Sequence, residues 1–166
     1  MCSTFEGHKW SHACTERRCV EDVIETQDLT LLGIRSLEID EIEFLRMHPE
    51  INVIYARDFE EIGRANAYKI IEERYRDYDA IYFTLDIDVL DPAFAPGTGT
   101  PAAGGISTRD LIDMVVMMHS KLPIVAMDIV EVAPPLDCSD ITVRAVLKVA
   151  YEVLGCIEKR INNVSI

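Results

Sequence analysis

Apolar positions recur along the chain with two different spacings, and each spacing predicts a different kind of element. Short continuous apolar runs are typical of strands covered on both faces of a parallel sheet, and they lie at residues 29–34, 51–56, 80–85 and 124–132. Longer stretches with apolar residues three and four positions apart predict amphipathic helices, and they lie at residues 15–26, 37–47, 59–75, 108–120 and 139–161. Ser139 is the expected N-cap of the last helix.

The alternation of strands and helices determines the expected fold class. Strands joined by helices form right-handed crossovers, which predicts an α/β fold of three layers (αβα) with a mainly parallel sheet. No linker, repeat or low-complexity tract divides the chain, so we expect a single α/β domain over residues 1–166. The first twelve residues carry no strand pattern, and about four strands are few for such a sheet. We therefore expect the fold to be incomplete at its N-terminus.

A pair of aspartates, Asp86 and Asp88, follows the third apolar run in the segment LDIDVLDP. Ligands of open parallel sheets collect at the carboxyl ends of the strands, and residues two apart on a strand point the same way. Two carboxylates so close repel each other unless a cation neutralises them, and a divalent metal ion suits this task. Two alternatives stay open: a solvated pair in the turn before Pro92, and the acidic pocket of a receiver domain. The receiver pocket requires further acidic residues and a late lysine, and neither is well placed here.

The loop after the acidic pair, residues 91–105, reads DPAFAPGTGTPAAGG. Its glycines allow backbone angles that other residues avoid, and its prolines restrict the rest. A loop with both properties can form a defined wall around a site. The phosphate-binding pattern GxxxxGK[ST] is absent, so we do not expect a phosphate cradle here.

Charge and cysteine content narrow the classes of binding partner and the cellular compartment that we expect for the protein. The 16 basic and 29 acidic residues give a net charge of −13, which argues against nucleic acid or an anionic membrane as a partner. No apolar stretch is long enough to span a bilayer, and the first twenty residues carry too many charges for a signal peptide. Five cysteines without a CxxC pair argue against a disulfide framework. We expect a cytoplasmic protein.

Four segments, in chain order, resemble the ureohydrolases, the family of arginases and agmatinases. The most specific is LDIDVLDPAFAPGTGTPAAGG at residues 85–105, whose APGTGTP stretch is most similar to agmatinases. EGHKWSHACTERR at 6–18 resembles the segment with the family's active-site histidine, GIR at 33–35 matches a strand end, and MDIVEVAPPLD at 127–137 resembles the C-terminal signature with its glutamate. The resemblance extends over almost the whole chain.

The resemblance implies a role for four residues. Asp86 and Asp88 match the two aspartates that bind the family's binuclear manganese (Mn²⁺) centre. Glu131 matches the glutamate that pairs with the substrate guanidinium, and His12 matches the histidine with a role in proton transfer or substrate positioning. The residues alone favour a site role for Glu131, which follows an apolar strand at its carboxyl end. His12 taken alone would be interpreted as a helix cap or a surface residue.

The chain also departs from the family pattern. The family's remaining four metal ligands come from Gly-Gly-Asp-His and Asp-Ala-His-x-Asp motifs, and neither motif occurs here. Both are expected upstream of His12, and the other histidines, His8, His48 and His119, do not replace them. We interpret Met1 as an internal methionine, an alternative start or the result of a truncated gene model. The chain is then the C-terminal part of a ureohydrolase-like domain.

The implied function is manganese-dependent hydrolysis of a guanidino group, with agmatine converted to putrescine and urea by a homo-oligomer. One alternative is an arginase or another hydrolase of guanidino acids. A second alternative, of a different class, is a non-catalytic remnant or a subunit that requires an N-terminal partner chain. Because two aspartates are too few for a tight two-metal centre, we expect the isolated chain to be inactive or nearly so.

Overall fold

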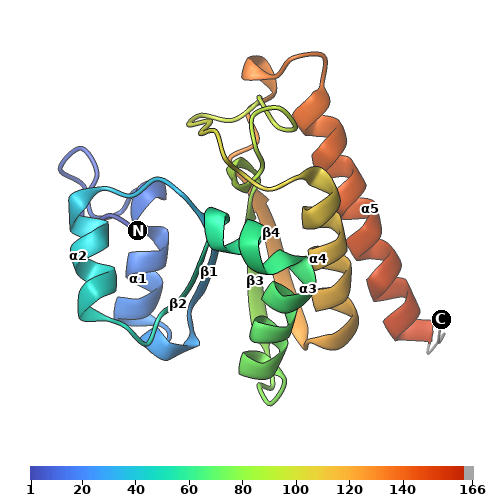
Figure 1. Cartoon of the computed structure of the whole chain (residues 1–166), viewed down its shortest axis with the longest axis horizontal. Helices are drawn as coiled ribbons and strands as arrows, with labels where there is room; N and C mark the ends of the chain where they lie inside the picture. Colours follow the sequence, from blue (N-terminus) through green and yellow to red (C-terminus); the bar gives the residue numbers. More distant parts are fainter. Residues whose placement is uncertain (163–166) are drawn as a thin grey trace. The chain divides into compact units, whose positions relative to one another are not determined.

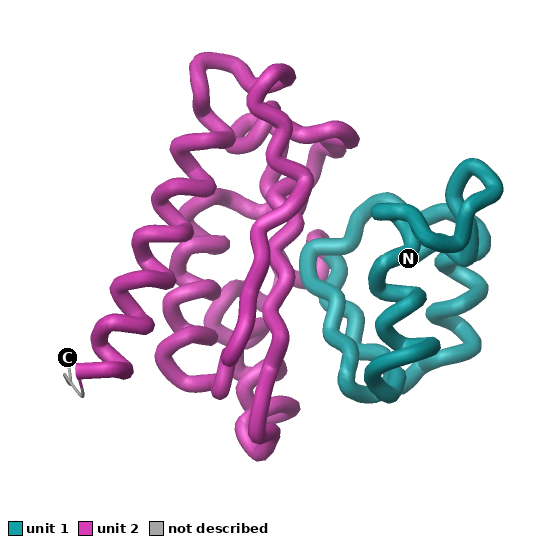
Figure 2. The backbone as a smooth tube through the Cα atoms, turned by 180° about the vertical axis from the view of Figure 1, so that it is seen from behind, with its two compact units in different colours: residues 1–55 teal, residues 56–166 magenta. Residues whose placement is uncertain are grey.

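The computed structural model describes residues 1–162 and consists of two compact units (Figure 2). The first unit extends from Met1 to Tyr55, and the second begins at Ala56. Each unit contains one pair of parallel strands. The α/β class and the parallel pairing agree with the sequence-based expectation, whereas the expectation of a single domain over 1–166 stays a prediction.

The first unit carries two strands that pair in parallel, with Thr30 opposite Asn52. Gly33 adopts a φ of 84°, and the register shifts at this point between Leu32 and Ile34. The elements of the first unit, in chain order, are η1 (His12–Cys14), α1 (Thr15–Asp22), η2 (Thr26–Asp28), β1 (Thr30–Ile34), α2 (Ile39–Met47) and β2 (Asn52–Tyr55).

The second unit carries the other strand pair and the longest helices (Figure 1). Its elements are α3 (Ala56–Tyr75), β3 (Ile81–Asp86), η3 (Ile87–Val89), α4 (Thr108–Lys121), β4 (Ile124–Val130), η4 (Pro134–Leu136) and α5 (Ile141–Asn162). The strands β3 and β4 are parallel, and the last residue of β3, Asp86, pairs with the last residue of β4, Val130. Both strands therefore end at the same edge.

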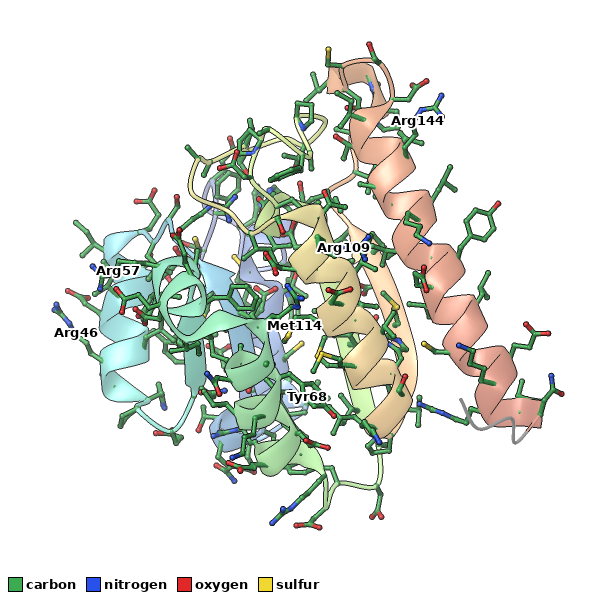
Figure 3. All side chains as sticks on the ribbon, turned by 45° about the vertical axis from the view of Figure 1, so that its right-hand side comes forward. Arg46, Arg57, Tyr68, Arg109, Met114 and Arg144 are labelled. Atoms are coloured by element: carbon green, nitrogen blue, oxygen red, sulfur yellow. The ribbon has the colours of Figure 1, made fainter. Side chains whose placement is uncertain are left out.

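One face of the β3–β4 pair packs against a helical layer. Leu85 is buried, and the ring of Phe83 meets the ring of His119 on α4 edge-on. Helix α4 in turn packs against α3 and α5, and its Met114 is buried, as is Tyr68 on α3 (both labelled in Figure 3). This layer forms the core of the second unit.

The other face of the same strand pair is open among the described residues. Tyr82 on β3 is 63% exposed, and Val125 on β4 is 68% exposed. The expectation that the apolar runs are strands covered on both faces is therefore wrong for this pair. The apolar runs predicted the strands correctly, but their composition does not reveal whether this chain itself supplies the second covering layer.

Each predicted helix differs from its predicted bounds at one end or both. Helix α1 stops at Asp22, and α3 begins at Ala56 and is interrupted at Gly63, whose φ of 75° is not helical. Helix α5 begins at Ile141, and Ser139, with a φ of 55°, is not its N-cap as predicted. Asp137 takes that task instead, because its carboxylate accepts backbone N–H groups of the first turn.

No helix within residues 1–162 combines the length and the apolar character that a membrane span requires.

The buried side chain of His119 makes the stability of the second unit depend on pH. It is 3% exposed, and burial lowers the pKa of its imidazole below the ordinary 6.5; the charge of Arg160 acts in the same direction, although a hydrogen bond to the carbonyl of Val115 opposes it. The folded state therefore favours neutral His119, and the unfolded chain takes up the proton first as the pH falls. Stability should decrease below pH 6.5.

We expect the free energy of unfolding to fall more steeply between pH 7 and pH 5 in the natural chain than in a His119→Gln variant. Urea denaturation followed by circular dichroism at both pH values measures the two slopes. Equal slopes would contradict a buried, neutral His119.

Candidate active site

The acidic pair occupies the end of β3 and the short turn that follows it. Asp86 is the last residue of β3, whereas Asp88 lies in η3. The backbone N–H of Asp88 donates to Oδ1 of Asp86 at 3.0 Å. Alternation along a strand is therefore the wrong reason to expect both carboxylates on one side, because Asp88 lies in a 3-10 turn and no longer in the strand. That the two carboxylates lie close together stays a prediction.

The glycine-rich loop contacts the acidic pair through Thr100, whose hydroxyl donates to Oδ2 of Asp88 at 3.2 Å. The base of the loop is closed by the backbone N–H of Asp91, which donates to the carbonyl of Ile106 at 3.1 Å. Oδ2 of Asp91 accepts the N–H of Gly104 at 2.8 Å. The loop is thus fixed at its base by these hydrogen bonds, and its role as a wall around a site stays a prediction.

Glu131 follows β4 directly and adopts an unusual backbone conformation. Its φ is 62°, and the left-handed region is uncommon for a residue with an ordinary side chain. Such strain persists only where the surrounding structure enforces it, and it is concentrated at functional sites. The prediction extended this strand to residue 132, but β4 ends at Val130, so Glu131 stands just outside the ladder.

The same loop borders both Asp88 and Glu131. Oε2 of Glu131 lies 3.6 Å from the position that a Cβ would take on Gly99, next to Thr100 in the sequence. The acidic pair at the end of β3 and in η3 and the glutamate after β4 therefore both lie beside a single loop. Asp86, Asp88 and Glu131 form what we call the carboxylate site.

Gly97 anchors this loop against the segment between β4 and α5. A Cβ at this position would stand 2.6 Å from Cβ of Asp137 and 2.9 Å from its Cα, closer than real Cβ atoms come. The carbonyl of Gly97 accepts the N–H of Ala133 at 2.8 Å. Only glycine permits this approach without a shift of backbone.

His12 belongs to the first unit, whereas the carboxylate site belongs to the second. It is exposed, its ring meets that of Phe5 edge-on at 5.2 Å, and its Nδ1 lies 3.4 Å from the hydroxyl of Ser11. It also lines an open, mostly apolar hollow of the first unit with Trp10, Thr15, Arg18, Cys19 and Val23. Its participation in the carboxylate site stays a prediction.

Asp86 and Asp88 have the right chemistry for a divalent cation but supply few ligands. Carboxylate oxygens suit Mn²⁺, Mg²⁺ and Ca²⁺. Over residues 1–162, no group of three or more His, Cys, Asp or Glu side chains is arranged to hold a metal ion. The residues present fit part of a manganese site and do not complete one.

Several polar residues near the site were not found by sequence reasoning. Asp128 on β4 accepts the hydroxyls of Tyr82 and Thr84 on β3 at 2.5 and 2.6 Å. A signal existed, since Asp128 is one of only two charged residues in the apolar run 124–132, and residues 82 and 84 alternate in phase with 86. Thr100 lay in the quoted loop but was not singled out as a partner of Asp88.

The arginase family model matches residues 2–156 of the chain. The agmatinase of Bacillus cereus is 39% identical over 153 residues, which cover 91% of this chain and 49% of that protein. The arginase of Entamoeba histolytica is 33% identical over 132 residues, covering 80% of this chain and 44% of that protein. The chain thus spans about half the length of the curated relatives that it matches.

A solved structure gives the same result at the level of the fold. Proclavaminate amidino hydrolase from Streptomyces clavuligerus superimposes with a TM-score of 0.84 at 32% sequence identity, over 93% of this chain and 52% of that chain. The resemblance therefore includes the three-dimensional arrangement as well as the motifs.

Gly97→Ala should destabilise the protein by about 1–3 kcal/mol, because the new methyl group requires the backbone at Asp137 to move. Gly99→Ala is the matched control, since its Cβ meets only Oε2 of Glu131 at an ordinary contact distance of 3.6 Å. The control should stay within about 0.5 kcal/mol of the natural chain. Urea denaturation measures both values, and equal stability of the two variants would contradict the close contact at Gly97.

Proposed function

Because the chain belongs to the arginase family, we propose that it supplies the C-terminal part of a manganese-dependent ureohydrolase that acts on agmatine. The reaction is hydrolysis of the bond between the guanidino carbon and the alkyl nitrogen, which releases urea and putrescine. The observation that carries the proposal is the loop that borders Asp88 through Thr100 and Glu131 through Gly99. It puts an anion for the substrate beside a pair of carboxylates suited to a metal ion.

Glu131 binds the guanidinium of the substrate. A carboxylate accepts charge-assisted hydrogen bonds from a planar guanidinium, and two parallel bonds fix its orientation as well as its position. Gly99 supports this role, because the absence of a side chain leaves the region in front of Oε2 open. The net charge of −13 also suits a cationic substrate.

Asp86 and Asp88 hold manganese. Their oxygens are of the type that Mn²⁺ prefers, and the remaining ligands come from outside the residues described here. The chemistry that bound manganese supplies is the activation of water near neutral pH. The hydrogen bond from Thr100 keeps one oxygen of Asp88 in a fixed direction.

His12 moves a proton between the site and solvent. Imidazole is the side chain that most often serves as a general acid or base, which suits this role. Its exposed position in the first unit is compatible with exchange of protons with water.

Agmatine is the preferred substrate because the APGTGTP stretch is most similar to agmatinases, and because agmatine lacks the α-carboxylate for which an arginine pocket requires a cation. The likeness to the Entamoeba histolytica arginase supports a second candidate, hydrolysis of arginine or another guanidino acid. The shortage of metal ligands supports a third, a non-catalytic remnant or a subunit that requires a partner chain.

We place the protein in the cytoplasm, since five cysteines without a CxxC pair suit a reducing compartment. The homo-oligomer implied by the family resemblance stays a prediction.

A chimaera tests the function directly. The part of the Bacillus cereus agmatinase that precedes the matched segment is joined to this chain, so that the missing ligands are restored. With Mn²⁺ added, we expect release of urea from agmatine at a kcat/KM at least tenfold above that for arginine. The 166-residue chain alone should show little or no turnover.

The parent agmatinase serves as the positive control for this assay. A folded chimaera that releases no urea from either substrate would contradict the proposal and favour a non-catalytic remnant. Preference for arginine would instead favour the second candidate.

Two substitutions in the chimaera separate the proposed roles. Asp88→Asn should abolish urea release and lower the manganese content, because a neutral amide is a poor ligand. Glu131→Gln should keep the manganese content and raise KM for agmatine about tenfold or more, since a charge-assisted hydrogen bond to the substrate is lost. Metal analysis and steady-state kinetics measure both.

Asp79→Asn and Glu73→Gln are matched controls, since both residues are exposed and lie outside the carboxylate site. Full manganese content in Asp88→Asn would disprove its assignment as a ligand. An unchanged KM in Glu131→Gln would disprove the assignment of the guanidinium to Glu131.

A further inference from the structure

The hydroxyl of Thr142 lies in the interior of the second unit, in the first turn of α5. The residue is 0% exposed. Its Oγ1 lies 2.9 Å from Oδ1 of Asp137 and 2.7 Å from the backbone N–H of Gly97. A hydroxyl has one proton and free lone pairs, so it can donate to one neighbour and accept from the other at the same time.

The charge of Asp137 sets the direction of these bonds. Burial alone would raise the pKa of its carboxyl group, but hydrogen bonds from the backbone N–H groups of Val143, Thr142 and Cys138 and from the Thr142 hydroxyl hold that pKa below its ordinary value. The carboxylate is therefore ionised at neutral pH and accepts only. The Thr142 hydroxyl must donate to Asp137, which leaves a lone pair for the N–H of Gly97.

Gly97 is held from three sides. Besides the bond to Thr142, Asp137 fills the space that a Cβ on Gly97 would take, and the carbonyl of Gly97 accepts the N–H of Ala133, two residues after Glu131. In Figure 1 the loop that follows β3 and the N-terminal end of α5 lie side by side. One glycine therefore joins the loop, the start of α5 and the segment that carries Glu131.

The path from Gly97 to the carboxylate site is short. Gly99 and Thr100 are two and three residues further along the chain, and they border Glu131 and Asp88 respectively. A displacement of Gly97 by even 1 Å would be passed to both contacts, because the intervening residue, Thr98, is 2% exposed and packed in the interior.

We propose that Asp137 and Thr142 are positioning residues of the carboxylate site. Through the hydrogen-bond chain from Asp137 to Thr142 to Gly97, they fix the loop so that Thr100 meets Asp88 and Gly99 meets Glu131. The N-terminal end of α5 thus sets the geometry of the carboxylate site through the loop. The inference rests on the proposed function, since it concerns the same three carboxylates.

Two substitutions of Thr142 separate the hydrogen bond from packing. Thr142→Val keeps the branched shape and removes the hydroxyl, whereas Thr142→Ser keeps the hydroxyl and removes a buried methyl group. A residue that acts only by filling space should tolerate Val better than Ser. A residue that acts through its hydroxyl should tolerate Ser better than Val. Val149→Ala, fully buried on the same helix, controls for a general loss of stability.

The primary measurement is amide hydrogen exchange by NMR on the full 166-residue chain at pH 7. In Thr142→Val we expect the amides of Gly97, which donates to Thr142, and of Ala133, which donates to the carbonyl of Gly97, to exchange about tenfold faster than in the natural chain. Thr142→Ser should restore exchange to within about twofold. In Val149→Ala the α5 amides should exchange faster, while the loop keeps its protection relative to the rest of the unit.

Titration with MnCl₂ in the same samples links the loop to the site. Paramagnetic broadening of the Asp86, Asp88 and Thr100 amides should require at least threefold more Mn²⁺ in Thr142→Val than in the natural chain or in Thr142→Ser.

Two results would overturn the proposal: loop exchange in Thr142→Val equal to that of the natural chain, or loop exchange raised equally by Thr142→Val and Val149→Ala. Absence of Mn²⁺ broadening in the natural chain would count only against Mn²⁺ binding by Asp86 and Asp88 without the further ligands, because the exchange data would still decide the role of Thr142. The two failures are therefore distinguishable.

Discussion

Repulsion between the carboxylates of Asp86 and Asp88 is the constraint on which the carboxylate site depends. Two like charges two residues apart are unfavourable unless hydrogen bonds or a cation compensate them. The structure supplies part of the compensation, because Asp86 accepts the N–H of Asp88 and Asp88 accepts the hydroxyl of Thr100. The glycine-rich loop is therefore more than a connection between β3 and α4. Its conformation determines how much of the negative charge is stabilised before any cation binds.

The strands, helices and loop that position this site were largely predictable from the sequence, but the residues at which they end and the residues that cap them were not. The apolar run before Asp86 predicted β3, and the glycines and prolines predicted a defined loop. The N-cap of α5 was assigned to Ser139, whereas Asp137 accepts the N–H groups of the first turn. Both residues are common N-caps, and the choice between them depends on Ser139 and Asp140 adopting positive φ angles. Local composition does not determine such a conformation, because positive φ angles are uncommon for Ser and Asp and are not indicated by the sequence pattern.

The faces of the strands illustrate a second limit of sequence reasoning. A continuous apolar run indicates a strand that is buried in the finished fold, but it does not indicate which part of the polypeptide buries it. Tyr82 and Val125 are exposed here, and the chain spans about half the length of its relatives. The absence of two of the family's metal-ligand motifs and the open face of β3–β4 thus both accompany a match to about half the length of the relatives.

The strained backbone of Glu131 connects these observations. A φ of 62° is costly for glutamate, by about 1–3 kcal/mol for such conformations in general, and β4 would not require it if the strand continued. The strain is maintained because the segment after Glu131 is fixed at Ala133 by the carbonyl of Gly97, which is itself held by Thr142. A relaxed backbone at this position would release the carboxylate from its place beside Gly99. The left-handed backbone of Glu131 thus lowers stability but keeps its carboxylate at the carboxyl edge of the sheet. The hydrogen bonds at the start of α5 offset that cost.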